Sequence, residues 1–168
     1  TIGKNITMGV SHSEEVIIKA SKMARFHHVA MRLPRKYLSL IQEKGVNLSG
    51  GEKQRLALSR GLLATADKPI LLMDEPTSSI DSKNELEIYK NIFREYGKKT
   101  IVSTVHRLHL LHLFDKIYYF KCGKIIASGS FRDLLKNDDF KMVWEKYRES
   151  KKDSKEPHDT RWKLQEDL

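Results

Sequence analysis

The chain has 168 residues, a length that accommodates one domain with a buried core. Its 31 basic and 22 acidic side chains give a formal charge of +9, which suits an anionic partner such as a nucleotide, a nucleic acid or an acidic membrane surface without choosing among them. The only cysteine, Cys122, excludes an internal disulfide, and no apolar run approaches the roughly 20 residues of a membrane-spanning helix, so we expect a soluble chain in a reducing compartment.

The N-terminal part of the chain is expected to be helical. Ser11 and Glu14 have the spacing of a capping box, and apolar residues then recur at helical intervals, so an amphipathic helix is expected to run toward Val29. A second helix is expected over residues 51–63, after a pair of glycines and before a breaking segment that ends at Pro69.

The middle of the chain predicts a βαβ unit. Residues 70–76, ILLMDEP, form an apolar run stopped by two carboxylates and a proline, which is typical of a strand covered on both faces. Residues 84–96 have helical character, and residues 100–106, TIVSTVH, form a second β-branched run. Strand, helix and strand follow within about 35 residues, which predicts a parallel sheet.

The last third of the chain predicts a hairpin followed by helices. Residues 116–120 and 124–128 have strand character on either side of a short turn, and helical character returns from Phe131. Charge and Pro157 dominate from Ser150 onward, so a mobile tail is expected there.

Three titratable side chains lie at the ends of the two predicted strands. Asp74 and Glu75 follow the first strand and His106 follows the second. Ligands of parallel sheets gather at the carboxyl ends of the strands, so these groups are expected to meet at one edge. An aspartate there suits Mg²⁺, usually through water, and the adjacent carboxylate can polarise an attacking water. Taken alone, such a pair is also commonly a turn or helix cap.

Four motifs, in this order and spacing, resemble the nucleotide-binding domain of an ATP-binding cassette (ABC) transporter. They are LSGGE at residues 48–52, ILLMDEP at 70–76, SSID at 78–81 and VHRL at 105–108. The resemblance extends from TIGKNI at the start of the chain, similar to TIRENI in the family, to GSFRDLL ending at Leu135, similar to GTHEELL. Each motif alone is weak, but their order is specific to the family.

The resemblance implies an α/β fold: the C-terminal part of a P-loop NTPase-like (RecA-like) parallel-sheet core, with an ABC α-helical subdomain. It divides the chain into a helical subdomain with the signature motif, the C-terminal half of the catalytic α/β core, and a C-terminal helix with a charged tail. These parts are residues 1–64, 65–135 and 136–168.

The resemblance also implies roles for single residues. In the family the signature motif opens a helix whose N-terminus points at the γ-phosphate of ATP held by the opposite domain of a dimer. This agrees with the positive end, about half a charge, of a helix dipole. Asp74 is similar to the Walker B ligand of Mg²⁺, Glu75 to the general base and His106 to the switch histidine. The signature residues are Leu48, Ser49, Gly50, Gly51 and Glu52, and the D-loop residues are Ser78, Ser79, Ile80 and Asp81, the last of which links the two sites.

Two features favour an exporter within the family. QEKG before the signature resembles the GERG loop of exporters, and HRL after the switch position is their usual form, whereas importers more often have HD. The chain departs from the family's usual residues in Lys44 for Arg, Ser79 for Ala and Gly61 for Ala. None of these residues takes a direct part in the expected chemistry. ATP and Mg²⁺ are then the implied cofactors. The implied partners are a second nucleotide-binding domain, identical or different, and transmembrane domains, at the cytoplasmic face of a membrane.

The 168 residues contain no G-x-x-x-x-G-K-[ST], the Walker A loop that binds the β- and γ-phosphates. We therefore expect a missing N-terminal half to carry that loop, and the isolated chain to be inactive as an ATP hydrolase. Two alternatives remain at this point. One is a non-transport module of the same superfamily that uses the +9 charge on nucleic acid, which the exporter features disfavour. The other is an inactive regulatory fragment.

Overall fold

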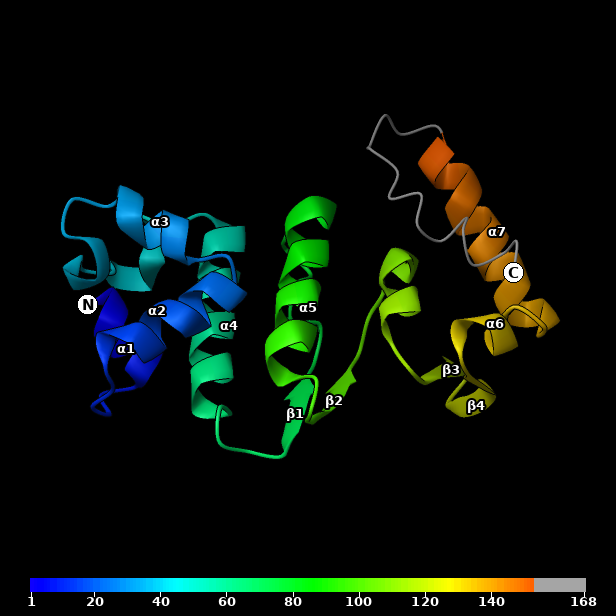
Figure 1. The fold of residues 1–168 in the computed structure, drawn as a ribbon. Helices are drawn as coiled ribbons and strands as arrows, with labels where there is room; N and C mark the ends of the chain where they lie inside the picture. Colours follow the sequence, from blue (N-terminus) through cyan, green and yellow to red (C-terminus); the bar gives the residue numbers. More distant parts are fainter. Residues whose placement is uncertain (153–168) are drawn as a thin grey trace. The chain divides into compact units, whose positions relative to one another are not determined.

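The computed structural model describes residues 1–152 and divides into two units between Thr104 and Val105 (Figure 1). The first unit contains α1 (Ile2–Thr7), α2 (Glu14–Met23), α3 (His27–Arg32), the 3₁₀ turns η1 (Lys36–Leu38) and η2 (Glu43–Gly45), α4 (Gly50–Ala64), β1 (Ile70–Met73), α5 (Ser82–Tyr96) and β2 (Thr100–Ser103). The second contains η3 (Leu108–Leu113), β3 (Ile117–Lys121), β4 (Lys124–Gly129), α6 (Phe131–Leu134) and α7 (Asp138–Lys152). No helix within residues 1–152 combines the length and the apolar character needed to cross a membrane.

The helix expected to run from Ser11 toward Val29 is wrong in its start and its length. The N-cap residue of α2 is Ser13, whose side chain makes no capping hydrogen bond, so the predicted capping box is not formed. The helix then breaks at Arg25, which adopts a left-handed φ of 52°. The Arg25 side chain explains why the break is tolerated, because its Nε donates a hydrogen bond of 2.6 Å to Oδ1 of Asn84 on α5.

Apolar side chains from several helices form the core of the first unit. Helices α1 and α2 pack against α4, and α2 also contacts α5 (Figure 1). Burying these side chains removes apolar surface from water, which is the main driving force for the packing. The fully buried ones include Ile2, Ile6, Phe26, Leu62, Ile88 and Ile92.

Strands β1 and β2 pair in parallel, which confirms the predicted βαβ unit. The prediction that β1 is covered on both faces is wrong for the described residues. Leu71 and Met73 are buried, whereas Ile70 and Leu72 are 52% and 73% exposed. Side chains alternate between the two faces of a strand, and α5 covers only one face of this two-stranded sheet (Figure 1).

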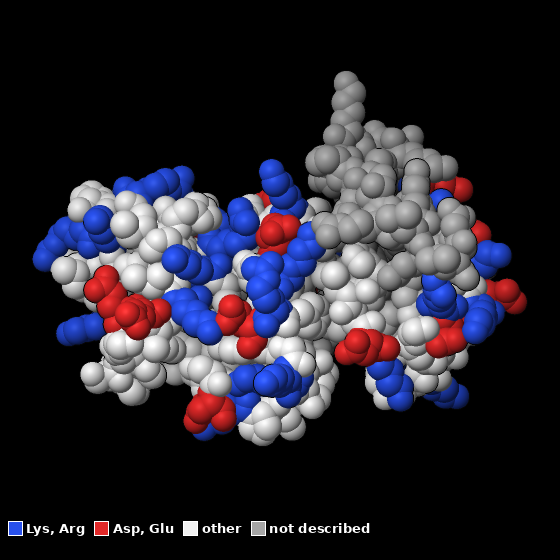
Figure 2. Space-filling view, viewed as in Figure 1, with Lys and Arg blue, Asp and Glu red and all other residues white. Residues whose placement is uncertain are grey.

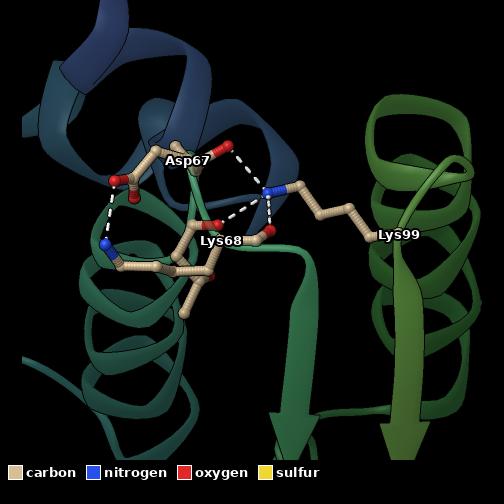
Figure 3. A network of polar contacts seen from close by, with 5 residues as sticks. Asp67, Lys68 and Lys99 are labelled. Carbon is tan, nitrogen blue, oxygen red and sulfur yellow. Dashed lines mark hydrogen bonds and ion pairs between the residues drawn. The ribbon is translucent and has the colours of Figure 1, made fainter.

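Lys99 joins the end of α4 to the start of β2 (Figure 3). Its Nζ donates hydrogen bonds of 2.7 Å to the carbonyl oxygens of Thr65, Ala66 and Lys68. A cation at the C-terminus of a helix is favourable because the free carbonyls there carry partial negative charge. The ammonium also lies 4.5 Å from the ring centroid of Tyr96, whose hydroxyl donates to the carbonyl of Leu62.

The second unit confirms the predicted hairpin and the helices after it. β3 and β4 pair antiparallel, and Cys122 and Gly123 in the turn have φ values of 51° and 74°, as a tight hairpin turn requires. Helix α7 continues to Lys152, and the rest of the tail expected from Ser150 lies outside the described residues. The core of this unit is Leu111, Ile117, Leu134, Phe140 and Trp144.

Candidate functional site

The signature segment forms the N-terminus of α4, and the predicted helix is confirmed. Ser49 is the N-cap residue, and its Oγ accepts a hydrogen bond from the backbone N–H of Glu52. The Glu52 carboxylate accepts in return from the backbone N–H of Ser49 at 2.9 Å. This capping box fixes the first turn of α4, and Leu48, buried just before it, anchors the entry of the chain.

The two glycines of the signature have different surroundings. A Cβ added to Gly50 would meet nothing within 4 Å, whereas one added to Gly51 would lie 3.0 Å from the carbonyl oxygen of Ser79. Neither glycine has a positive φ. Gly51 therefore allows the close approach of a neighbouring loop, and Gly50 leaves the outer side of the helix start open.

The two predicted carboxylates lie where β1 ends, at the carboxyl edge of the parallel pair. Met73 pairs with Ser103, so Asp74 comes next to Thr104. The Thr104 hydroxyl donates a hydrogen bond of 2.6 Å to Oδ1 of Asp74 and accepts one of 2.9 Å from the backbone N–H of Glu75. Both carboxylates are exposed, as groups that meet a solvent-borne ligand must be.

Glu75 has a left-handed φ of 42°, which is uncommon for a residue other than glycine. Such conformations cost free energy and persist only where surrounding contacts hold them, and they cluster at functional sites. The strained position is that of the carboxylate expected to act as base.

Gln54 links α4 to the loop after β1. Its Nε2 donates to the carbonyl of Glu75 at 3.2 Å and to Oγ of Ser78 at 2.9 Å, and its Oε1 accepts from the backbone N–H of Ser79 at 2.7 Å. The start of the signature helix and the residues around the expected base are therefore directly connected.

The last two residues of the predicted D-loop have structural contacts in the described chain. Ile80 is buried, and Asp81 is the N-cap of α5. The Asp81 carboxylate accepts hydrogen bonds from the backbone N–H and the side-chain amide of Asn84. Burial acts to raise the pKa of Asp81, but these hydrogen bonds and nearby Arg55 outweigh it and keep the pKa below its ordinary value. A role of Asp81 between two nucleotide sites stays a prediction.

His106 belongs to the second unit, three residues past the end of β2. Its approach to Asp74 and Glu75 therefore stays a prediction. Two other histidines contact tyrosines: Nδ1 of His27 lies 2.9 Å from the hydroxyl of Tyr37, and Nδ1 of His109 lies 3.0 Å from that of Tyr147. Residues 1–152 contain no cluster of three metal-ligating side chains.

Basic side chains lie near the start of α4, and one of them is paired with an acidic residue there. Arg32 forms an ion pair of 2.6 Å with Glu52. The hydrogen bond from Ser49 is the main cause that lowers the pKa of the Glu52 carboxyl, and Arg32 adds to it. Burial lowers the pKa of Arg55. On the face of the first unit drawn in Figure 2, acidic side chains are interspersed among the basic ones, unlike the single-sign stripe typical of nucleic-acid binding.

Two residues of the site were not among those predicted. Thr104 could have been found from the sequence, because a polar residue that follows the second strand lies opposite the one that follows the first. Gln54 carried no such signal, since a glutamine in the first turns of a helix is commonly solvated.

Comparison with known proteins finds that the similar proteins belong to one family. Residues 2–78 match the family described as ABC transporter. The chain is 39% identical over 140 residues to the "ABC multidrug transporter mdr1" of Aspergillus fumigatus, and 38% identical over 146 residues to the "ABC transporter B family member 24, mitochondrial" of Arabidopsis thaliana. These matches cover 82% and 86% of the chain. A solved structure of a bacterial Atm1-family ABC exporter with ATP bound has a TM-score of 0.76 and 32% identity over 94% of the chain.

The chain spans only a part of these proteins. It covers 10% and 21% of the lengths of the two relatives and 27% of the chain in the solved structure. What it shares with them is therefore a segment of the nucleotide-binding domain that includes the signature helix and the strand with its terminal carboxylates.

Proposed function

Since the chain belongs to the ABC transporter family, as part of a nucleotide-binding domain of the exporter type, we propose that it takes part in binding and hydrolysing ATP to drive transport across a membrane. The observation that carries the proposal is the direct link between the N-terminus of α4 and the carboxylate pair after β1. Gln54 makes this link through its hydrogen bonds to Glu75, Ser78 and Ser79.

The N-terminus of α4 is suited to a phosphate. Free backbone N–H groups and the helix dipole attract an anion, and the open side of Gly50 lets one approach closely. The Ser49 hydroxyl uses its oxygen in the capping box, so its hydrogen can be donated. We assign Leu48, Ser49, Gly50, Gly51 and Glu52 to the γ-phosphate of a nucleotide held by a second nucleotide-binding domain.

The carboxylates are suited to the chain's own nucleotide. Glu75 would accept a proton from the attacking water, and Asp74 would contact Mg²⁺, usually through water. The donor set fits this ion, because Mg²⁺ in nucleotide sites is held by one or two carboxylates together with phosphates and water. Bound Mg²⁺ would neutralise charge on the phosphates, and His106 is assigned to the γ-phosphate.

The phosphate loop must come from outside these 168 residues, since they contain no G-x-x-x-x-G-K-[ST]. Most phosphate contacts in enzymes of this class come from that loop and its lysine. We therefore propose that the chain functions with an upstream half that carries the loop, with a second nucleotide-binding domain and with transmembrane domains, at the cytoplasmic face of a membrane. The 168 residues alone are inactive in this proposal.

Calorimetric titration with Mg-ATP tests the assignment. The 168-residue chain alone is expected to give no saturable binding, and the chain joined to a phosphate-loop half is expected to bind and hydrolyse Mg-ATP. Glu75→Gln in the joined protein should retain binding and lose about 10² to 10⁴ in rate, the usual contribution of a general base. Hydrolysis near the wild-type rate in that variant contradicts the role of Glu75. Binding without hydrolysis in the wild type would instead favour a regulatory fragment.

A further inference from the structure

We propose that Gln54 is a positioning residue, which holds Glu75 in its strained backbone conformation and ties it to the N-terminus of α4. The proposal rests on the proposed function, in which Glu75 is the general base. Gln54 itself contacts neither nucleotide nor water in this proposal and acts through Glu75.

The carboxamide of Gln54 uses both of its polar atoms on one loop. Nε2 reaches the carbonyl of Glu75 at 3.2 Å and Oγ of Ser78 at 2.9 Å, while Oε1 accepts from the N–H of Ser79 at 2.7 Å. The amide of glutamine offers a donor and an acceptor side by side, without a charge. A carboxylate keeps the acceptor and loses the donor, and an aliphatic side chain loses both.

Gln54 and Thr104 hold the two sides of Glu75. The N–H of Glu75 donates to the Thr104 hydroxyl, and its carbonyl accepts from Gln54. A residue other than glycine at a φ of 42° needs such support, because the left-handed region is disfavoured by its Cβ. This backbone conformation sets the direction of the Cα–Cβ bond of Glu75.

The same loop also touches α4 at Gly51. The Ser79 carbonyl approaches Gly51 so closely that an added Cβ would lie 3.0 Å away. The loop is therefore held against the start of α4 by a packing contact at Gly51 and by the hydrogen bonds of Gln54. A phosphate that binds at the N-terminus of α4 would thus bind next to residues that are hydrogen-bonded to the Glu75 loop.

Hydrogen exchange on the 168-residue chain tests the connection without nucleotide. Gln54→Leu removes the acceptor of the Ser79 N–H, so exchange of that amide should become at least about tenfold faster. Gln54→Glu should leave it protected, because the carboxylate still accepts. Ala57→Leu is the control, since it introduces the same side chain at an exposed position of α4. Unchanged exchange of Ser79 in Gln54→Leu overturns the proposal.

Steady-state kinetics on the chain joined to a phosphate-loop half test the consequence for Glu75. Both Gln54→Leu and Gln54→Glu should lower kcat by roughly tenfold, because both lose the hydrogen bond to the Glu75 carbonyl, and should change KM for ATP by less than about threefold. Ala57→Leu should keep wild-type values. A kcat within about twofold of wild type in Gln54→Glu also overturns the proposal.

Mixed dimers separate an effect on Glu75 from an effect on the signature. With Glu75→Gln in the partner copy, only the Glu75 of the Gln54→Leu copy can act, and hydrolysis should fall by about tenfold. In the second mixed dimer, one copy carries both substitutions and the partner is wild type. The partner's Glu75 then acts with an unchanged Gln54 beside it, and hydrolysis should fall less than in the first dimer. If hydrolysis instead falls more in the second mixed dimer than in the first, Gln54 acts through the signature motif and the proposal is overturned. Absence of hydrolysis in the wild-type assembly would reject the proposed function, and hydrogen exchange would still decide the position of Gln54.

Discussion

The Thr104 hydroxyl lies 2.6 Å from Oδ1 of Asp74 and joins the ends of two parallel strands. It also accepts the N–H of Glu75, so one hydroxyl serves both residues of the carboxylate pair. Its hydrogen is committed to Asp74, which leaves its oxygen to hold the backbone of Glu75. The geometry of the pair therefore depends on a residue 29 positions away from Glu75.

Thr104→Val keeps the shape of the side chain and removes both hydrogen bonds. In the chain joined to a phosphate-loop half, we expect Mg-ATP hydrolysis to fall by roughly thirtyfold, from the loss of about 1 kcal/mol for each of the two hydrogen bonds. Thr104→Ser retains the hydroxyl and should restore most of the rate. Equal rates for the valine and serine variants would contradict a role for the hydroxyl.

The two signature glycines should respond in opposite directions to alanine. Gly50→Ala adds a Cβ in open space and should be neutral or stabilise by up to about 1 kcal/mol, because alanine is the better helix former. Gly51→Ala forces the Cβ toward the Ser79 carbonyl and should lower the free energy of unfolding by about 1–3 kcal/mol. Urea denaturation of the two variants measures the difference, and equal midpoints would show that the loop yields without cost.

Lys99→Met should destabilise the chain by about 1–3 kcal/mol, because three carbonyl oxygens at the end of α4 lose a charged donor. Lys98→Met is a matched control, since Lys98 is exposed and adjacent. Urea denaturation should leave the control within about 0.5 kcal/mol of wild type. Similar losses in both variants would attribute the effect to net charge.

Glu52 should make the stability of the first unit depend on pH. Its pKa is lowered in the folded chain, mainly by the hydrogen bond from the Ser49 N–H, so its contribution is present at neutral pH and is lost as the pH falls through the lowered pKa. Glu52→Gln keeps the shape and cannot titrate. Wild type should exceed this variant by about 1 kcal/mol at pH 7, and the difference should shrink below about pH 4. A difference that is constant with pH would exclude this titration.

The sequence predicted elements whose signals are local. The pair of glycines predicted the start of a helix, and α4 begins at Gly50. The β-branched runs around α5 predicted β1, β2 and their parallel pairing. The carboxylates at the end of β1 followed from the same pattern, because parallel strands bring their carboxyl ends to one edge.

Features that depend on contacts between distant residues were not predicted. The break at Arg25 is stabilised by Asn84, 59 residues away, and helical periodicity across the break gave no sign of it. The exposed face of β1 was also missed, because Ile70 and Leu72 have the apolar character of buried residues. Gln54 was missed because its partners lie on a loop more than 20 residues further along the chain.

The three oxygens that bind Lys99 all belong to the main chain. The connection from α4 to β1 should therefore tolerate substitutions better than changes of length. Side chains at Ala66 and Asp67 can vary without loss of the acceptors, since every residue supplies a carbonyl. The number of residues cannot vary so freely, because an insertion or deletion would move the carbonyls away from one fixed ammonium. Natural variation in this connection should therefore consist of substitutions at constant length.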